Sequence, residues 1–151
     1  MNQTWPLELL LVAQAVSTFG MLGVIWLVQL VNYPLKVFVP SDEFVRYQAR
    51  HMRRITVVVG PLMLVEAGSS AWLVLLPLEG PMMIAAWIGM ALVMVLWIST
   101  LVFQIPAHRK LEREKDQAAI ASLVRFNWVR TIVWTARAGV VAWMMVLSMT
   151  A

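Results

Sequence analysis

The side chains best suited to chemistry in this sequence stand near the ends of apolar segments. The chain has two histidines, His51 and His108, and amide or basic residues accompany both. Residues spaced three or four apart share one face of a helix. Two such stripes combine aromatic, amide and basic side chains, namely Trp97, Gln104 and His108, and Asn127, Arg130 and Trp134.

These groups predict a binding pocket between the ends of several helices. Imidazole, amide and guanidinium groups can donate hydrogen bonds to an oxyanion or a carbonyl oxygen, and indole rings supply planar walls. His51 is the candidate acid or base, because it shares a stripe with Tyr47 and Ile55 and so faces neighbouring helices. Interfacial snorkelling by the basic side chains is the alternative. The expected ligand contacts are Arg54, Trp97, Gln104, His108, Asn127, Arg130 and Trp134.

The sequence contains few residues that could ligate a metal ion. Zinc and di-iron sites draw on several histidines and carboxylates. His51 has no nearby carboxylate on its stripe, and the acids near His108, Glu112 and Glu114, are expected on a loop that faces water. The absence of cysteine excludes disulfides, iron–sulfur clusters and thiolate-ligated haem. We therefore predict no metal site. Haem b held by His51 and His108 stays open as an alternative, because it needs only two axial imidazoles; no other cofactor is indicated.

Glu66 and Arg137 stand inside apolar segments, where charges are costly and face the interior of a bundle. At 1.5 Å of rise per residue, both lie at a similar depth from the basic ends of their helices. We expect a buried ion pair, which either fixes helix packing or serves as a proton-sensitive or ligand-binding pair. In the halves of the helices farther from the basic ends, the polar groups Gln14, Ser69 and Ser70 are expected to be isolated.

The elements that position these residues are four membrane spans. Hydrophobic residues make up 61% of the 151 positions and charged residues only 13%, about half the charge of a water-soluble domain. A bilayer core needs about 20 apolar residues of helix. We predict one all-α membrane domain, a four-helix bundle, with spans at 9–31, 55–76, 82–105 and 131–149.

The distribution of charge predicts the orientation of these spans. Eleven of the 12 basic residues lie between spans one and two or between spans three and four. The positive-inside rule then places both long connections in the cytoplasm and both termini outside. Such segregated charge argues against a nucleic-acid partner. Membrane lipid is the expected partner, in a bacterial inner membrane, and a homo-oligomer is left open.

Local signals refine the elements. Ser41 precedes two acids and is expected to cap a helix that leads into span two. Gly60 and Pro61 are expected to kink that span. The connections are expected to be helical extensions. Pro34 and Pro106 follow related phrases in the two halves, which favours two tandem helical hairpins related by an axis along the membrane normal.

Four phrases carry a resemblance to a known group of proteins. They are Val31-Asn32-Tyr33-Pro34-Leu35, His51-Met52-Arg53-Arg54-Ile55, Gly60-Pro61-Leu62-Met63-Leu64-Val65-Glu66 and Asn127-Trp128-Val129-Arg130-Thr131. With the four-span layout, they resemble uncharacterised bacterial four-helix membrane proteins, distantly similar to the anthrone-oxygenase-like family. That resemblance implies oxidation of small polycyclic aromatics without an evident cofactor. It assigns no catalytic residue.

Three classes of function follow from the sequence. The first is a membrane protein that binds a small anionic, quinone-like or aromatic molecule in a pocket of the cytoplasmic leaflet, with or without redox chemistry. The second is a membrane oxygenase or oxidoreductase, either cofactor-independent or haem-dependent. The third is a structural or accessory subunit. A transporter ranks lower, because one small four-helix bundle offers little room for alternating access.

Overall fold

The computed structural model describes residues 5–150 and contains four helical rods, each long and apolar enough to cross a membrane. The first and third rods each contain a π-helical turn, and the second and fourth are uninterrupted. In chain order the elements are α1 (Trp5–Leu27), η1 (Val28–Asn32), α2 (Tyr33–Leu35), η2 (Lys36–Phe38), α3 (Ser41–Leu75), α4 (Gly80–Ser99), η3 (Thr100–Gln104), α5 (Ile105–Leu111) and α6 (Gln117–Met149). The all-α fold predicted from the sequence is confirmed.

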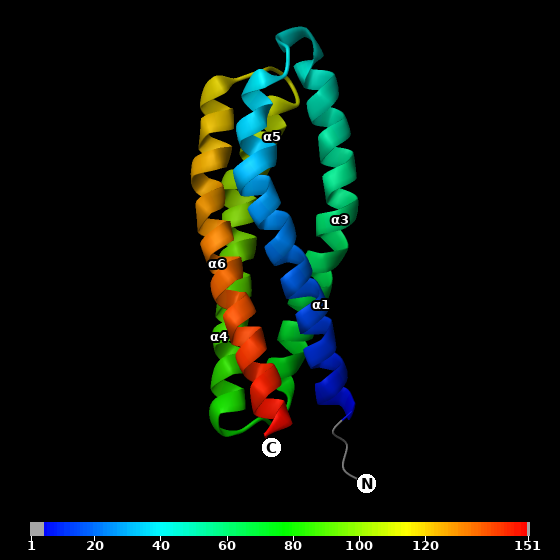
Figure 1. The fold of residues 1–151 in the computed structure, drawn as a ribbon, viewed down its shortest axis with the longest axis vertical. Coiled ribbons are helices and arrows are strands. Elements are labelled where there is room, and N and C mark those ends of the chain that lie inside the picture. Colours follow the sequence, from blue (N-terminus) through cyan, green and yellow to red (C-terminus); the bar gives the residue numbers. More distant parts are fainter. Residues whose placement is uncertain (1–4, 151) are drawn as a thin grey trace.

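The rods form an antiparallel ring. Packing joins α1 to α3, α3 to α4, α4 to α6 and α6 back to α1, so α3 and α6 stand on one diagonal. The start of α1 and the end of α6 lie at the same end of the bundle, together with the turn between α3 and α4 (Figure 1). The connections that carry most of the basic residues lie at the other end, here called the basic end.

Each π-helical turn directly precedes a proline-containing segment. The Tyr33 amide bonds to the Val28 carbonyl, and the Ile105 amide bonds to the Thr100 carbonyl, five residues back in both cases. Pro34 and Pro106 follow one residue later; proline lacks an N–H and clashes with the carbonyl four residues before it. The wider turn accommodates that clash. Its recurrence in both halves agrees with the tandem-hairpin interpretation.

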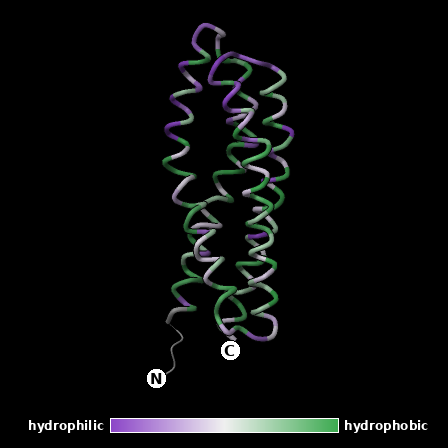
Figure 2. The backbone as a smooth tube through the Cα atoms, turned by 180° about the vertical axis from the view of Figure 1, so that it is seen from behind, coloured by the Kyte–Doolittle hydropathy of each residue, from purple (hydrophilic) through white to green (hydrophobic). Residues whose placement is uncertain are grey.

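Apolar side chains cover the outside of the bundle as well as its core. Exposed residues include Leu9, Phe38, Leu75 and Ile132. Figure 2 shows hydrophobic residues along most of the rods and hydrophilic ones gathered at the basic end. Water would not tolerate so large an apolar surface, whereas lipid tails do. The chain is a multi-pass membrane protein whose helices contact lipid.

One local prediction needs correction. Ser41 is the first residue of α3 and makes no capping bond; Pro40 occupies the cap position instead. Gly60 and Pro61 lie within α3, which continues as one helix from Ser41 to Leu75, and the kink expected there stays a prediction. The connections at the basic end are mostly helical extensions, as expected; the exceptions are residues 39–40 and 112–116. Beside the second of these, the Lys110 ammonium is ion-paired with Asp116 and lowers the pKa of that carboxyl.

Candidate functional site

A buried polar network crosses the bundle at Glu66 and Arg137. The Arg137 Nε atom lies 2.7 Å from Glu66 Oε1, with both side chains about 2% exposed or less. This pair joins α3 to α6 across the diagonal of the ring. Thr18 donates to Glu66 Oε1 at 2.7 Å, and the Trp134 indole donates to Glu66 Oε2 at 3.1 Å. The carboxylate of Glu66, on α3, therefore has three donors from two other helices, α1 and α6.

The same guanidinium is also bound on its far side. Arg137 Nη1 donates to the Gly89 carbonyl at 2.6 Å, and Nη2 donates to Gln14 Oε1 and to the Ser70 hydroxyl. The Gln14 amide nitrogen reaches Ser69 and Ser70 at 2.8 and 2.9 Å. Our expectation that these polar residues are isolated was wrong. Sequence spacing on single helices does not show that Arg137 extends across the bundle to meet them.

This central network is neutral and satisfied. One carboxylate balances one guanidinium, and no side-chain nitrogen or oxygen of the network is a buried atom without a partner. A buried charge that is paired and hydrogen-bonded stabilises one packing arrangement, whereas a half-satisfied one is costly. Of the two roles left open for the pair, the contacts therefore favour helix packing.

A second polar network occupies the basic end. The Lys36 ammonium donates to Gln48 Oε1 at 2.7 Å, although both side chains are 0% exposed. The Gln48 amide nitrogen lies 2.9 Å from His108 Nδ1, and His108 Nε2 lies 2.9 Å from the Tyr33 hydroxyl. These four side chains come from η2, α3, α5 and α2. They connect three of the four rods.

A third set of polar contacts ties α6 to the first rod at the same end. Asn127 donates to Gln29 Oε1 at 2.9 Å, and Gln29 donates to the Val124 carbonyl at 3.2 Å. Arg130 Nη1 donates to Asn127 Oδ1 at 3.2 Å. The Arg130 guanidinium also lies 5.0 Å from the centre of the Trp134 ring, a cation–π contact.

An internal cavity of about 230 Å³ lies between these contacts and the middle of the bundle. Its apolar wall is formed by methionine, valine and isoleucine side chains, most of them from the first rod and from α3. Six polar side chains line it as well: Tyr33, Thr56, Thr100, Gln104, His108 and Arg130. Pockets that bind small molecules share this composition, a mostly apolar wall with a few convergent polar groups.

Buried polar atoms without partners gather at this cavity. Neither the nitrogen nor the oxygen of the Gln104 amide has a hydrogen-bond partner, although the residue is 2% exposed. The Arg130 Nε atom is also buried and unpartnered. Most buried polar groups in proteins are hydrogen-bonded, because an unmade bond costs about 1 to 3 kcal/mol. The cavity therefore offers donors and an acceptor that a bound molecule can satisfy.

Positive charge at the basic end is not balanced locally. Lys36 and Arg130 are both buried, yet the ion pairs among residues 7–150 are Lys110 with Asp116 and Glu66 with Arg137. A buried cation without a carboxylate favours a neighbour that carries negative charge or a carbonyl dipole. Arg130 lines the cavity, and Lys36 reaches it through Gln48 and His108.

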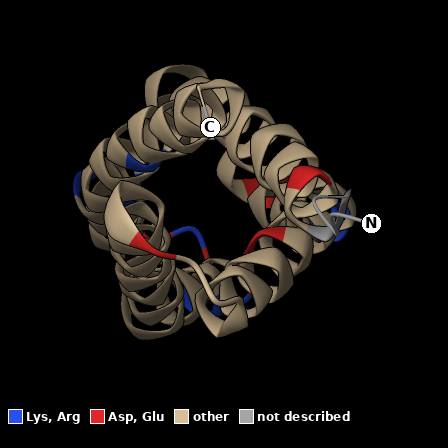
Figure 3. Cartoon of the chain, turned by 90° about the horizontal axis from the view of Figure 1, so that it is seen from below, with Lys and Arg blue, Asp and Glu red and all other residues tan. Residues whose placement is uncertain are grey.

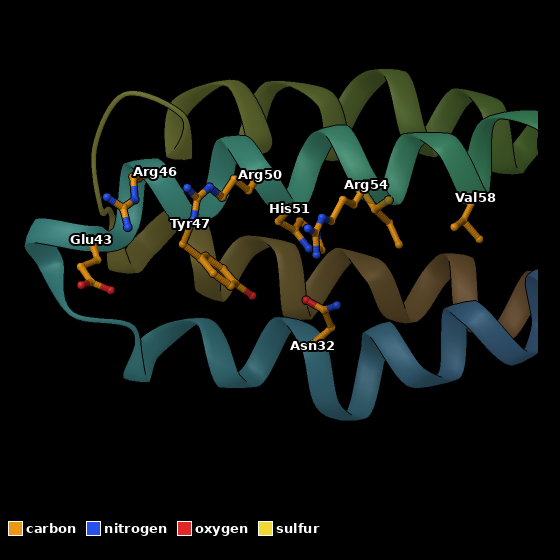
Figure 4. Close-up of a pocket in the computed structure, with 9 residues that line it drawn as sticks. Asn32, Glu43, Arg46, Tyr47, Arg50, His51, Arg54 and Val58 are labelled. Atoms are coloured by element: carbon orange, nitrogen blue, oxygen red, sulfur yellow. The ribbon is translucent and has the colours of Figure 1, made fainter.

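An open groove of about 580 Å³ runs beside the cavity along the first half of α3 (Figure 4). Arg46, Arg50 and Arg54 recur every four residues along it, and Asn32 faces them from η1. The Asn32 side-chain oxygen is buried and unpartnered. Ile55 lines both the groove and the cavity, so one side chain stands between them.

The structure separates the predicted ligand contacts into two groups. Gln104, His108 and Arg130 line the cavity. The others do not: His51 and Arg54 line the groove, Asn127 and Trp134 are held in the networks described above, and Trp97 packs against the core around Trp134. Trp134 does not line the cavity, and its indole N–H donates to Glu66. The predicted acid or base, His51, stands 6.2 Å from the His108 ring, measured between ring centres.

The donor set does not fit haem. Both nitrogens of His108 are already hydrogen-bonded, to Gln48 and to Tyr33, so the ring has no free lone pair for iron. The His51 ring stacks beside Tyr47, with ring centres 6.1 Å apart. Among the described residues, no group of three or more histidine, cysteine or acidic side chains could hold a metal ion.

Three residues of the basic-end network were absent from the predicted site: Tyr33, Lys36 and Gln48. Tyr33 and Lys36 were visible as polar residues at the end of span one, but their burial depends on how the π-helical turn orients them. Gln48 is spaced four residues after Phe44, which is also buried. A polar residue on a buried stripe was the signal that pointed to it.

Comparison with known proteins gave no relative. No family model, curated protein or solved structure matches the chain.

Proposed function

We propose that this membrane protein binds a small apolar molecule with a carbonyl or oxyanion group, quinone-like or aromatic, in the internal cavity. The observation that carries the proposal is Gln104, a buried amide whose two polar atoms have no partner and which lines a mostly apolar cavity. A molecule with a polar head and a planar apolar body fits both parts of the cavity.

The charge of the site supports the same class of ligand. Arg130 and Lys36 are buried near the cavity without a carboxylate partner. A carbonyl oxygen, a phenolate or a carboxylate stabilises such cations, whereas an ammonium ligand would add to the unbalanced charge. The resemblance to the anthrone-oxygenase-like family, associated with polycyclic aromatics, agrees with this choice and is the reason to test for oxidation of the ligand as well.

The proposed setting is the inner membrane of a bacterium, with the basic end in the cytoplasm. Under the positive-inside rule, the arginine-rich connections stay in the cytoplasm. The ligand then reaches the cavity from the inner leaflet through the groove between α3 and η1, passing Ile55. Apolar molecules that partition into lipid take such a lateral route without crossing the aqueous phase.

Binding of two bicyclic probes tests this proposal. The first is 2-methyl-1,4-naphthoquinone, and the second is 2-methylnaphthalene, which lacks both carbonyls. Purified protein should bind the quinone more tightly. Gln104→Leu should weaken quinone binding about tenfold, and Arg130→Met about tenfold or more, because each removes hydrogen bonds from the carbonyl head.

Arg125→Met is the matched control, since Arg125 lies on the same helix and is exposed. It should bind the quinone as the parent does. Equal binding of both probes by the parent protein, or unchanged quinone binding in the Gln104 and Arg130 variants, would show that the cavity is not a site for carbonyl-bearing ligands.

A further inference from the structure

Lys36, Gln48, His108 and Tyr33 form a chain of hydrogen bonds, and the donor and acceptor of each bond can be assigned. An ammonium group has three donors and no acceptor, so Gln48 Oε1 must accept from Lys36. The other atom of that amide, Nε2, is then a donor, and it lies 2.9 Å from His108 Nδ1. The His108 Nδ1 atom must therefore accept, and it carries no hydrogen.

That assignment determines the form of the imidazole. A histidine without a hydrogen on Nδ1 is neutral and carries its hydrogen on Nε2. His108 Nε2 then donates to the Tyr33 oxygen, 2.9 Å away. The Tyr33 proton cannot point back to Nε2. Within residues 7–150, no other acceptor is in hydrogen-bond geometry with it.

We propose that the hydrogen-bond chain formed by Lys36, Gln48, His108 and Tyr33 directs the Tyr33 proton into the cavity. There Tyr33 is the hydrogen-bond donor to a carbonyl oxygen of the ligand. The inference rests on the proposed function and deepens it, since it names the chemistry of the ligand atom and a residue that touches it. Tyr33 lines the cavity beside Gln104 and Arg130. The buried end of the ligand is an acceptor.

The buried Lys36 ammonium strengthens the Tyr33 hydroxyl as a donor. Each bond in a chain of hydrogen bonds polarises the next one, and the effect is larger where water is excluded. Lys36, Gln48 and Tyr33 are all 4% exposed or less. Donors from Tyr33, Gln104 and Arg130 together suit a carbonyl oxygen that gains negative charge, as the oxygen of a quinone does.

The substitution Gln48→Glu should reverse the direction of the hydrogen-bond chain, and it leaves the side-chain volume at position 48 nearly unchanged. A carboxylate accepts on both oxygens, so it accepts from Lys36 and from a hydrogen on His108 Nδ1. The neutral His108 Nε2 atom then becomes an acceptor for the Tyr33 proton, which leaves the ligand without its donor. Gln29→Glu is the matched control: Gln29 is buried at the same end but does not contact His108.

The direction of the chain can be measured without any ligand. In protein labelled with ¹⁵N-histidine, the nitrogen shifts report which ring nitrogen carries hydrogen, and His51→Gln assigns the two signals. His108 should be the neutral Nε2–H form in the parent and in Gln29→Glu, and should carry hydrogen on Nδ1 in Gln48→Glu. A parent His108 with hydrogen on Nδ1, neutral or charged, would overturn the inference.

The contact with the ligand is measured with 2-methyl-1,4-naphthoquinone labelled with ¹³C at its carbonyls. Tyr33→Phe and Gln48→Glu should each weaken quinone binding about tenfold and raise the carbonyl stretching frequency. Binding of 2-methylnaphthalene should not change, which shows that the cavity has kept its shape. Unchanged affinity and frequency in both variants would overturn the role of Tyr33 and leave the proposed function standing. Failure of the parent protein to bind the quinone would refute the proposed function, while the histidine spectra still decide the direction of the chain.

Discussion

Glu66 and Arg137 show how much a single buried pair depends on its surroundings. The carboxylate accepts from Arg137, Thr18 and Trp134, and the guanidinium also reaches the Gly89 carbonyl. Removing one partner strands the other charge in an apolar interior. The energy of the pair is therefore measured only when both members are changed together.

A double-mutant cycle at this pair should show strong coupling. Glu66→Gln or Arg137→Met alone should each lower the unfolding free energy in detergent by about 3 to 5 kcal/mol, because the remaining charge is buried and unpaired. The double variant should recover much of that loss. Lys110→Met, which breaks an exposed ion pair, should leave the unfolding midpoint unchanged. Additive losses in the double variant would mean that the pair does not interact.

Gly89 is required by the approach of Arg137 to the helix backbone. A Cβ at position 89 would lie 2.9 Å from Arg137 Nη1, closer than such contacts permit. Gly89→Ala should destabilise the protein by about 1 to 3 kcal/mol through overpacking, more than the helix propensity gained. Gly139→Ala, in α6 with open space around it, should be neutral or stabilising. Thermal unfolding in detergent compares the two, and equal midpoints would contradict this role of Gly89.

At the scale of the element, the π-helical turns decide which side chains face inward. Each residue of an α-helix turns the backbone by about 100°. A π-helical turn takes up one additional residue, so the residues after it face a direction about 100° from the one that a continuous α-helix would give them. In the first rod the residues that follow η1 include Tyr33 and Lys36, which are buried. In the third rod they include His108. The basic-end network therefore depends on both turns.

Deletion of Leu30 tests the importance of the first turn. Leu30 is 59% exposed within η1. The wider turn takes up one residue, so removal of Leu30 should convert the turn to regular α-helix and leave Tyr33 and Lys36 facing the bundle interior. The ¹⁵N spectrum of His108 should then keep the Nε2–H signature. Deletion of Val16, which is 64% exposed in the α-helical part of the same rod, should instead rotate one part of the rod against the other by about 100°, so that the signature is lost and quinone binding falls. If the Leu30 deletion also loses the signature, the π-helical turn does not take up the additional residue.

At the scale of the whole molecule, the two ends of the bundle differ in charge and in connections. The basic end carries the groove and the cavity, and the opposite end carries both termini of the described chain and the turn between α3 and α4. Lipid surrounds the apolar rods between them. The orientation of the bundle consequently determines which leaflet supplies the ligand.

Single cysteines can determine the orientation, because the chain has no cysteine of its own. Glu79→Cys and Glu114→Cys replace exposed acids at opposite ends. A membrane-impermeant thiol reagent applied from outside intact cells should label position 79 only, because the positive-inside rule places the basic end in the cytoplasm. Labelling of position 114 from outside would reverse the orientation and place the groove in the outer leaflet.

The sequence by itself determined the four spans, their helical state and the asymmetry of charge, because these follow from composition and from residues close together in the chain. It also indicated that Glu66 and Arg137 lie at one depth, since rise per residue is constant. It could not show which side chains meet. Gln14, Gln48 and Gly89 acquire their roles only when helices far apart in sequence pack together. The tertiary structure also decided that His51 faces an open groove and that His108 is enclosed by hydrogen bonds. For His108, the π-helical turn before it changes the helical phase on which sequence spacing depends.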